Sequence, residues 1–360
     1  MAESRYERLM DGNRRNFLKT FAAGAAGLVG ATLTGTGFAR AAGSLETTSR
    51  VGFETGTDRR EMIVSSLKPF ENEIGTAIDG KKVLIKVNMG QVEGPLNATH
   101  PDTVRGILDF LKPIYKKTVV VAESTAGSGR STLDGFENFK YTRIPREFKA
   151  DFVDLNERPF TKMWIRGNEG FPLGINIIDD YTDPDTYVIS ATRLKSHNCV
   201  IATLSLKNIA MGSPVNHYKQ KNPRGRNEKS NMHSGGNQGL SYNIFQLAKQ
   251  GVRPDLAVLD GVVGMEGDGP VWGTPVEQGV VVSGTDWLAC DRLGVELMGM
   301  DYNDILYLQW CANAGLGQDD LDKIQVVGPS WRSHVIEYRL HKNIAQQLEW
   351  VHQLREAQSS

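Results

Sequence analysis

Short runs rich in β-branched residues alternate with amphipathic helical patterns along most of this chain. Such alternation predicts parallel βαβ units, because a strand that returns parallel to its neighbour needs a crossover helix. We expect strands over 83–88, 118–123, 151–155, 186–194, 202–207, 256–260, 279–283 and 323–327, and helices over 101–115, 286–298, 302–314 and 344–358. The sequence therefore predicts an α/β fold with a mostly parallel or mixed sheet flanked by helices, in a single large domain that two lobes could divide.

The N-terminal segment has the order of an export signal. Residues 13–19 read Asn-Arg-Arg-Asn-Phe-Leu-Lys, a mildly apolar stretch follows to Phe38, and Ala39-Arg40-Ala41 offers a small-residue cleavage site. Lys19 and several glycines make this stretch a poor membrane span. We expect residues 1–41 to be a twin-arginine signal peptide that the twin-arginine translocase reads, so that the folded chain works in the periplasm or elsewhere outside the cytoplasm, without a stable membrane anchor. An ordinary N-terminal helix is the alternative.

Charge and cysteine content exclude some partners and cofactors. Removing residues 1–41 from a chain with 41 basic and 42 acidic side chains leaves 35 against 39, a balance that does not attract nucleic acid. The three cysteines, Cys199, Cys290 and Cys311, include no Cys-x-x-Cys pair, so we expect no iron-sulfur cluster. Buried unpaired cysteines are the simpler expectation, and at most one disulfide could form.

The sequence predicts three parts: the signal over residues 1–41, an α/β domain over 42–330, and a C-terminal helical tail over 331–360. Within the domain, residues 216–239 form a polar, locally basic loop that contains His217 and His233. A loop of this length is functional or disordered more often than not, so a lid, a ligand-contacting loop and idle surface all stay open. We expect His334, His341 and His352 on the surface.

Basic and polar residues two apart close two predicted strands. Lys86 and Asn88 end one strand, and Lys195 and His197 end another. Side chains two apart share a strand face, and ligands of open α/β sheets bind beyond the carboxyl ends of the strands. A third element ends in Lys207 and Asn208. Lysines that enter one cleft would suit a carboxylate or phosphate; the alternative is that each one simply leaves the sheet for solvent.

Acidic residues and a further histidine join these candidates. His100 precedes a helix, Glu123 ends a strand, and Asp260 opens a glycine-rich run that contains Glu266. Carboxylates so placed could hold a hard divalent cation or pair an acid with a base. Equally, Asp260 could cap a turn and Glu266 could pair with a lysine.

The order of these motifs resembles domain of unknown function family 362. The series is Ile85-Lys86-Val87-Asn88, His100-Pro101, Leu194-Lys195-Ser196-His197, Leu206-Lys207-Asn208 through Gly212, His233, Asp260-Gly261 with Glu266 and Gly269-Pro270, then Asp286 and Asp291, within residues 83–317. The resemblance implies an α/β domain whose polar positions gather in one site. The activity of the family is not established, and many relatives carry a ferredoxin-like cluster domain or its cysteines, which this chain does not.

Our leading functional hypothesis is an exported enzyme that acts on a small carboxylate or phosphate, with a divalent metal at Asp260, Glu266 and Glu123 as an option. Lys195, His197 and His233 are its candidate catalytic residues, with His197 or His233 transferring a proton. Lys86, Asn88, His100, Lys207 and Asn208 are its candidate substrate-binding residues, because lysines can hold developing negative charge. The alternative is a protein that captures a metal, cofactor or anion, or assists maturation, without turnover.

Overall fold

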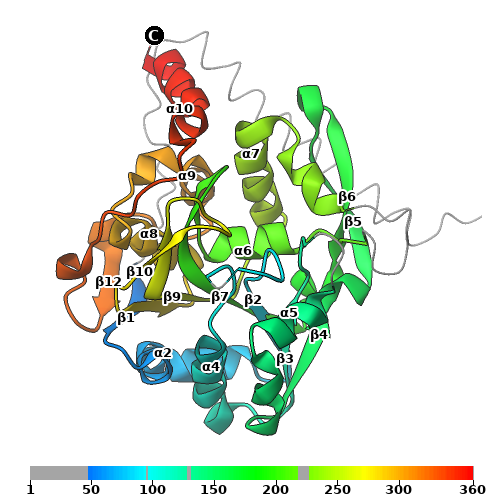
Figure 1. The fold of residues 1–360 in the computed structure, drawn as a ribbon, viewed down its shortest axis with the longest axis vertical. Helices are drawn as coiled ribbons and strands as arrows, with labels where there is room; N and C mark the ends of the chain where they lie inside the picture. Colours follow the sequence, from blue (N-terminus) through cyan, green and yellow to red (C-terminus); the bar gives the residue numbers. More distant parts are fainter. Residues whose placement is uncertain (1–47, 95, 128–130, 218–226, 360) are drawn as a thin grey trace, which may run out of the picture.

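The computed structural model describes residues 48–94, 96–127, 131–217 and 227–359; the predicted signal, residues 1–41, lies outside them. Its main sheet has ten strands and is flanked by helices on both faces (Figure 1). The strands are β1 (Ser49–Thr55), β2 (Lys82–Val87), β3 (Val119–Glu123), β4 (Ala150–Asp154), β7 (Thr186–His197), β8 (Ile201–Thr203), β9 (Leu256–Glu266), β10 (Thr274–Val276), β11 (Val280–Gly284) and β12 (Ile324–Val327). This sheet confirms the predicted α/β fold.

The strand order is β12-β1-β11-β9-β7-β2-β3-β4, with β8 beside β7 and β10 beside β9. From β9 to β4 neighbouring strands on this path run parallel, whereas β11 is antiparallel to both β9 and β1. Because β2, β3 and β7 are parallel, their carboxyl ends meet at one edge of the sheet. The polar residues that follow these strands therefore start from the same edge, as the sequence predicts.

Two helical layers cover the sheet. One contains α2 (Arg59–Leu67), α3 (Glu71–Ala77) and α4 (Pro101–Ile114); the other contains α6 (Ser205–Gly212), α7 (Gly236–Lys249), α8 (Trp287–Leu297) and α9 (Leu306–Asn313) (Figure 1). Strand β2 divides its side chains between two cores, since Val83, Ile85 and Val87 pack with the α2–α4 layer and Leu84 packs with the α6–α9 layer. Strand alternation places Lys86 on the Leu84 side. That alternation aims the lysine at α6.

The predicted strand over 202–207 is wrong beyond Thr203. Strand β8 ends there, and α6 begins at Ser205. Two features favour a helix: Leu206 and Ile209 are both buried at helical spacing, and the Asp291 carboxylate accepts hydrogen bonds from the backbone N–H groups of Ser205 and Leu206. A carboxylate in that position satisfies the free N–H groups of a first turn and complements the helix dipole. Lys207 and Asn208 thus lie on a helix.

Some elements had no prediction: β1, α2, α3, α7, and a separate two-stranded hairpin, β5 (Phe160–Arg166) with β6 (Pro172–Ile178). The hairpin buries Met163 and Ile165 of β5 and Ile175, Ile177 and Ile178 of β6 against the α6–α9 layer, and its other residues are partly or fully exposed. A short helix, α5 (Thr132–Asn138), packs beside β4. No helix among the described residues combines the length and apolarity needed to cross a membrane.

The segment 216–239 is not one continuous loop. Its described residues include the helical turn η6 (Glu228–His233), and α7 starts inside the segment at Gly236; residues 218–226 lie outside the description. The turn forms because Asn227 caps it and Lys229 and Met232 are buried. Near the C-terminus, α10 (Ile344–Ser359) forms where the sequence predicts a terminal helix.

Candidate functional site

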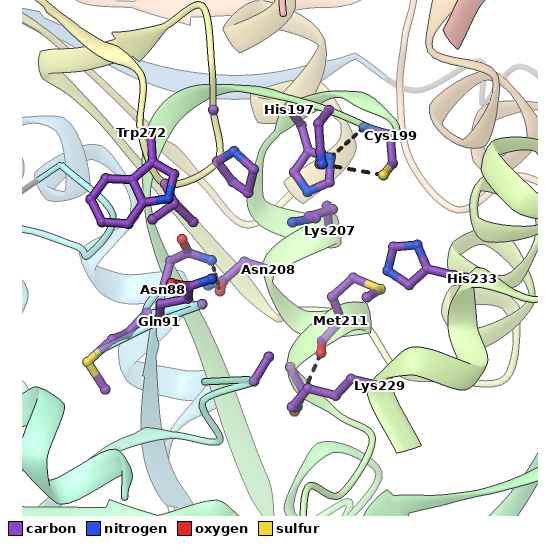
Figure 2. A pocket seen from close by; sticks show the side chains of 18 of the residues that line it. Asn88, Gln91, His197, Cys199, Lys207, Asn208, Met211, Lys229, His233 and Trp272 are labelled. Carbon is purple, nitrogen blue, oxygen red and sulfur yellow. Dashed lines mark hydrogen bonds between the residues drawn. The ribbon is translucent and has the colours of Figure 1, made fainter. Parts of the chain in front are cut away.

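A cavity of about 660 Å³ opens at the sheet edge where β2, β3 and β7 end. Figure 2 shows side chains from several separate segments converging on it. The predicted site residues that line the cavity are Lys86, Asn88, Glu123, His197, Lys207, Asn208 and His233. Among these predicted residues, side chains up to 147 positions apart in the sequence, from Lys86 to His233, share one cavity. We call it the main pocket.

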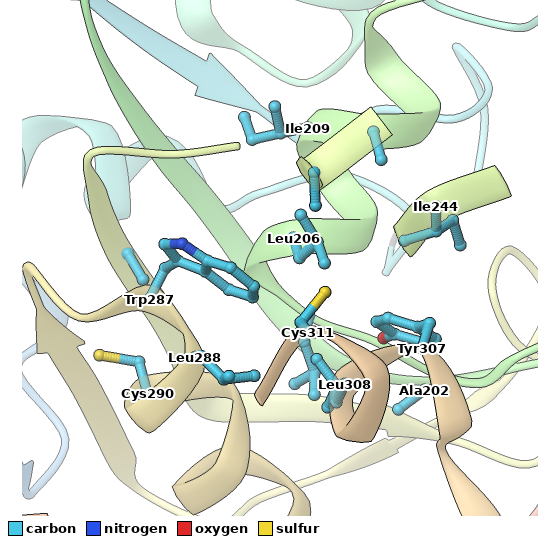
Figure 3. Close-up of a cluster of buried hydrophobic side chains, with 14 of the residues drawn as sticks. Ala202, Leu206, Ile209, Ile244, Trp287, Leu288, Cys290, Tyr307, Leu308 and Cys311 are labelled. Atoms are coloured by element: carbon cyan, nitrogen blue, oxygen red, sulfur yellow. The ribbon is translucent and has the colours of Figure 1, made fainter. Parts of the chain in front are cut away.

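Helix α6 forms the floor of the main pocket, and it is amphipathic although both of its sides are buried. Its apolar side chains, Leu206 and Ile209, enter the hydrophobic cluster formed with α7, α8 and α9 (Figure 3). Its other side presents Lys207, Asn208 and Met211 to the pocket. Burial of each large apolar side chain is worth about 1.5–3 kcal/mol, enough to hold a helix whose opposite face carries a buried lysine.

Both ends of α6 are tied to charged side chains. At the N-terminus, Asp291 is fully buried, and burial raises its pKa to about 7. At the C-terminus, Lys229 Nζ donates to the carbonyl oxygens of Met211, Gly212 and Pro214 at 3.2, 2.8 and 2.7 Å. Burial lowers the pKa of Lys229 to about 7. Asp291 accepts from the free N–H groups at one end of α6 and Lys229 donates to the free carbonyl groups at the other, so the two side chains fix the floor of the pocket.

Lys229 was not among the predicted site residues. Its sequence neighbourhood is polar and basic, which predicts exposure, yet only 4% of this side chain is accessible. Lys229 donates to carbonyl groups at the C-terminal end of α6, which otherwise lack partners within the helix. This role could be predicted only if residues 205–212 were first recognised as a helix.

The second lysine of the pocket, Lys86, is paired. Its Nζ lies 2.6 Å from Glu123 Oε1 and also donates to the Val87 carbonyl and to Asn208 Oδ1. Burial lowers the pKa of Lys86, and the charge of Glu123 opposes that shift. Gly212 permits this arrangement, because a Cβ there would lie 2.5 Å from Lys86 Cε. Lys86 and Glu123 are thus a fully desolvated ion pair in the wall.

A chain of hydrogen bonds continues from this pair to the third lysine. Asn88 Nδ2 donates to Asn208 Oδ1, and Lys195 Nζ donates to Asn88 Oδ1 and to the Asn97 carbonyl. Lys195 is not itself among the residues lining the main pocket, and burial lowers its pKa well below the usual range. The predicted residues Lys86, Asn88, Lys195 and Asn208 therefore form one buried network in which each side chain already has partners.

Lys207 differs from the other lysines of the site. Its side chain is 8% accessible and lines the pocket, and among the described residues no hydrogen bond or ion pair satisfies its Nζ. Burial lowers the pKa of Lys207 to about 8, so that most molecules still carry the ammonium charge at neutral pH. A buried cation that faces a cavity without a partner is costly unless a ligand supplies one.

His197 has a defined tautomer. The backbone N–H of Cys199 donates to its Nδ1 at 3.0 Å, and burial, followed by the charge of Lys207, lowers the pKa of His197 well below its usual value. A neutral ring that accepts at Nδ1 carries its proton on Nε2. Within the described chain no hydrogen bond involves this Nε2. His197 therefore offers an N–H donor to a ligand.

His233 lies across the pocket from His197, with Lys207 between the two rings (Figure 2). It is exposed at the pocket mouth, and no hydrogen bond links either ring nitrogen to another described residue. Partial burial and then the charge of Lys207 lower its pKa, so the ring is neutral at pH 7. A neutral imidazole with a free nitrogen can accept a proton.

The C-terminal segment also reaches the site. His341 lines the main pocket, against the expectation of a surface residue, and its Nε2 lies 3.6 Å from Asp268 Oδ1. Gln347, in α10, donates to the His197 carbonyl and accepts from the Ile201 N–H. The turn between β7 and β8 is thus held by a residue 150 positions away. Nothing in the local sequence of residues 341–347 signals this contact.

Three predicted residues lie apart from the main pocket. His100 is the N-cap of α4, where its Nδ1 accepts from the Asp102 N–H. Asp260 is fully buried and accepts from Arg59 Nε at 2.8 Å and from the Thr103 hydroxyl. Glu266 contacts Arg339 and Thr274. Asp260 is thus structural, as one alternative expected, but it binds the side chains of Arg59 and Thr103 rather than a turn. Glu266 is paired, as the other alternative expected, but with Arg339 rather than with a lysine.

The proposed metal ligands are consequently not assembled. Glu123 is paired with Lys86, Asp260 with Arg59 and Glu266 with Arg339, in three separate networks. In the described parts of the chain, no group of three or more His, Cys, Asp or Glu side chains could hold a metal ion. These residues do not fit a divalent metal held by protein ligands alone, because such sites need several convergent donors.

Comparison with known proteins gives one close family match. The model for "Domain of unknown function (DUF362)" matches residues 83–296. The thylakoid-associated protein sll1697 of Synechocystis is 24% identical over 224 residues, which cover 62% of this chain and 64% of that protein. This chain thus spans less than two thirds of the length of that relative.

Two solved structures match part of this chain. A lactate racemase apoprotein from Thermoanaerobacterium thermosaccharolyticum has 14% identity and a TM-score of 0.35, covering 68% of this chain and 55% of that one. A protein from Thermotoga maritima has 12% identity and a TM-score of 0.36, covering 62% and 55%. TM-scores this low support no conclusion about the site. The family match, by contrast, spans most of the sheet and all of α6, and on that ground this chain belongs to the DUF362 family.

Proposed function

We propose that this chain binds a small anion, a carboxylate or a phosphate, at Lys207 in the main pocket, and acts on it as an enzyme. The observation that carries the proposal is the Lys207 ammonium, which is buried, faces the cavity and has no hydrogen-bond partner among the described residues. Lys86, Lys195 and Lys229 all have protein acceptors, so they shape the pocket rather than bind its ligand. An anion at Lys207 would supply the missing acceptor with a charge-assisted hydrogen bond.

The two histidines have complementary roles, because one donates a hydrogen bond and the other can accept a proton. Neutral His197 offers its Nε2–H as a donor to an anionic oxygen, so it orients and stabilises negative charge. Neutral His233 has a nitrogen lone pair available and serves as the general base. In this assignment a proton leaves the substrate for His233 while Lys207 and His197 hold the charge that develops.

A second function, ligand capture without turnover, is favoured by a specific feature of His233. Catalytic bases are commonly oriented by a hydrogen bond from a third group. No described residue supplies such a bond to His233, and the carboxylate of Glu123 is engaged by Lys86. A turnover screen with small phosphate esters and hydroxy acids separates the two functions. Turnover that is lost in His233→Ala supports the enzyme, whereas binding without turnover supports capture.

Titration calorimetry with orthophosphate and with acetate tests the anion site. We expect Lys207→Gln and Lys207→Met to weaken binding tenfold or more, because a hydrogen bond to a charged group contributes about 1.5–3 kcal/mol and each 1.4 kcal/mol is tenfold. Lys112, exposed on α4, provides the control variant Lys112→Gln, which should bind as the wild type does. Equal binding by the wild type and both Lys207 variants would refute the site.

Export through the twin-arginine translocase, with a periplasmic or other extracytoplasmic location, is part of this proposal. Its support is the sequence of residues 13–41 alone. Conservative replacement of Arg14 and Arg15 by lysine should retain the precursor inside the cell, as fractionation and immunoblotting would measure. Unchanged export of the variant would contradict it.

A further inference from the structure

Trp272 is the large aromatic side chain at the main pocket that remains open to solvent. Its side chain is 66% accessible, although the residue lines the same cavity as Lys207 (Figure 2). An indole exposed to water costs free energy. Single apolar residues scattered over a surface are common, but an exposed indole at a pocket indicates a place where a ligand can pack.

The backbone that carries Trp272 is held firmly. The segment between β9 and β10 leaves no room for side chains at Gly269 or Gly273, because a Cβ would lie 2.1 Å from the Ser196 carbonyl oxygen or 2.3 Å from that of Glu266. Ser196 Oγ donates to the Gly267 carbonyl, and the Trp272 N–H donates to the Asp268 carbonyl. The indole is therefore exposed on a fixed support, which lowers the entropy lost when a ligand packs on it.

A second cavity, of about 790 Å³, adjoins the main pocket at this residue. Four residues line both cavities: Asp268, Trp272, His341 and Lys342. The polar part of this shared wall consists of surface ion pairs, since Asp268 lies 3.3 Å from Lys342 Nζ and both side chains are exposed. Exposed ion pairs of this kind contribute little free energy, so the indole is the part of the shared wall most able to contribute to ligand binding.

We infer that Trp272 is a stacking platform, and that the ligand of this site is an anion that also carries a ring, with the anionic group at Lys207 and the ring face on the indole, directed toward the second cavity. This inference rests on the proposed function for the anionic group. The ring could be aromatic, or a sugar that presents its apolar C–H face; both offer the flat apolar surface that an exposed tryptophan recognises.

Calorimetry with three probes tests the platform: orthophosphate, phenyl phosphate and glucose 1-phosphate. We expect at least one ring-bearing phosphate to bind the wild type about fivefold more tightly than orthophosphate, which is the scale of one aromatic contact. Trp272→Ala should remove this advantage and leave orthophosphate binding unchanged, and Trp272→Phe should retain part of it. Whichever of the two ring probes shows the advantage identifies the aromatic or the sugar class.

The control is Phe171→Ala, which removes another exposed aromatic side chain, 69% accessible, that does not line either cavity. An advantage that survives in Trp272→Ala, or that is equally lost in Phe171→Ala, would overturn the platform while leaving the anion site intact. Loss of orthophosphate binding in the Lys207 variants bears on the anion site alone. If the wild type binds none of the three probes, both proposals fail together.

Discussion

Two buried charged clusters of this fold differ in how their charges are satisfied: one lies at Asp260 in the middle of β9, and the other lines the main pocket. In the first, the Asp260 cluster, the carboxylate accepts from Arg59, from Thr103 and from the Val262 N–H, at 2.8, 2.6 and 3.0 Å. In the second, at the main pocket, Lys86 and Lys195 are equally well satisfied, but Lys207 Nζ has no hydrogen-bond partner in the part of the chain that the structure describes. The difference is one missing acceptor.

This comparison separates structural from functional burial of charge. Removing a charge from water costs free energy in both clusters, and a fully partnered cluster offsets that cost with ion pairs and hydrogen bonds inside the protein. The Asp260 cluster does so with residues from α2, α4 and β9, so it joins the helical layer to the sheet. At Lys207 the same offset requires an acceptor from a bound ligand. Burial and charge alone therefore do not mark a binding site, whereas an unsatisfied charge that faces a cavity does.

The largest effect that tests this comparison is on stability at Asp260. Asp260→Asn removes the charge that partners Arg59, and we expect a loss of about 3–5 kcal/mol in the free energy of unfolding, measured by urea denaturation, because it leaves a buried guanidinium without its anion. Orthophosphate binding to the folded variant should be unchanged. The double variant Arg59→Met with Asp260→Leu should recover much of the stability. A stable Asp260→Asn that no longer binds anions would place Asp260 in the functional site.

A smaller loss is expected at the C-terminal end of α6. Lys229→Met leaves the carbonyl groups of Met211 and Pro214 without their side-chain donor, while Gly212 keeps the Ser124 hydroxyl, and we expect a loss of about 2 kcal/mol in the free energy of unfolding near pH 7. The pH dependence identifies the cause. With a folded pKa of about 7 against a usual value near 10.5, the unfolded lysine binds more protons across that window, so wild-type stability should rise between these pH values.

The matched control for that experiment is Lys342→Met, which alters an exposed lysine at the pocket rim. This variant should keep the wild-type stability and its dependence on pH. If Lys229→Met keeps the same rise in stability as the wild type, the rise comes from another group, and the account of the α6 C-terminus given above is incorrect.

Much of the sheet edge could be predicted from the sequence, because strand alternation fixes which residues share a face. Lys86 lies near the end of β2, Asn88 follows that strand, and His197 ends β7, where the pattern placed them. The contributions of Trp272, His341 and Gln347 could not be predicted, since they depend on how loops and the C-terminal segment pack over that edge. The sequence left Asp260 open between a metal ligand and a structural residue, because its partner Arg59 lies on a helix that the periodicity did not reveal.

The α6 error has the same origin. Residues 202–207 have the apolar alternation of a strand, and the decision for a helix from Ser205 onward is made by Asp291, 86 positions later. Local propensity is a weak guide where a distant carboxylate satisfies the first N–H groups of a helix. The consequence for the site is direct, because the helix lets Lys207, Asn208 and Met211 all reach the pocket, whereas a strand would send the adjacent Lys207 and Asn208 to opposite faces.

The smallest expected effect is the pH dependence of anion binding, and it addresses Lys207 itself. Sulfate keeps its charge from pH 6 to 10, so any change in its affinity reports on the protein. With a pKa of about 8, free Lys207 is protonated below that pH and loses its charge above it, so sulfate affinity should be constant or slightly higher at low pH and should fall above pH 8 by at most tenfold per pH unit. Because sulfate stabilises the ammonium, the midpoint measured at saturating sulfate should lie above the midpoint of the free protein. In Lys207→Met the fall above pH 8 should vanish, leaving only weak binding. A fall of the same size in that variant would mean that the titrating cation is one of the partnered lysines, and the contrast between the two clusters would lose its basis.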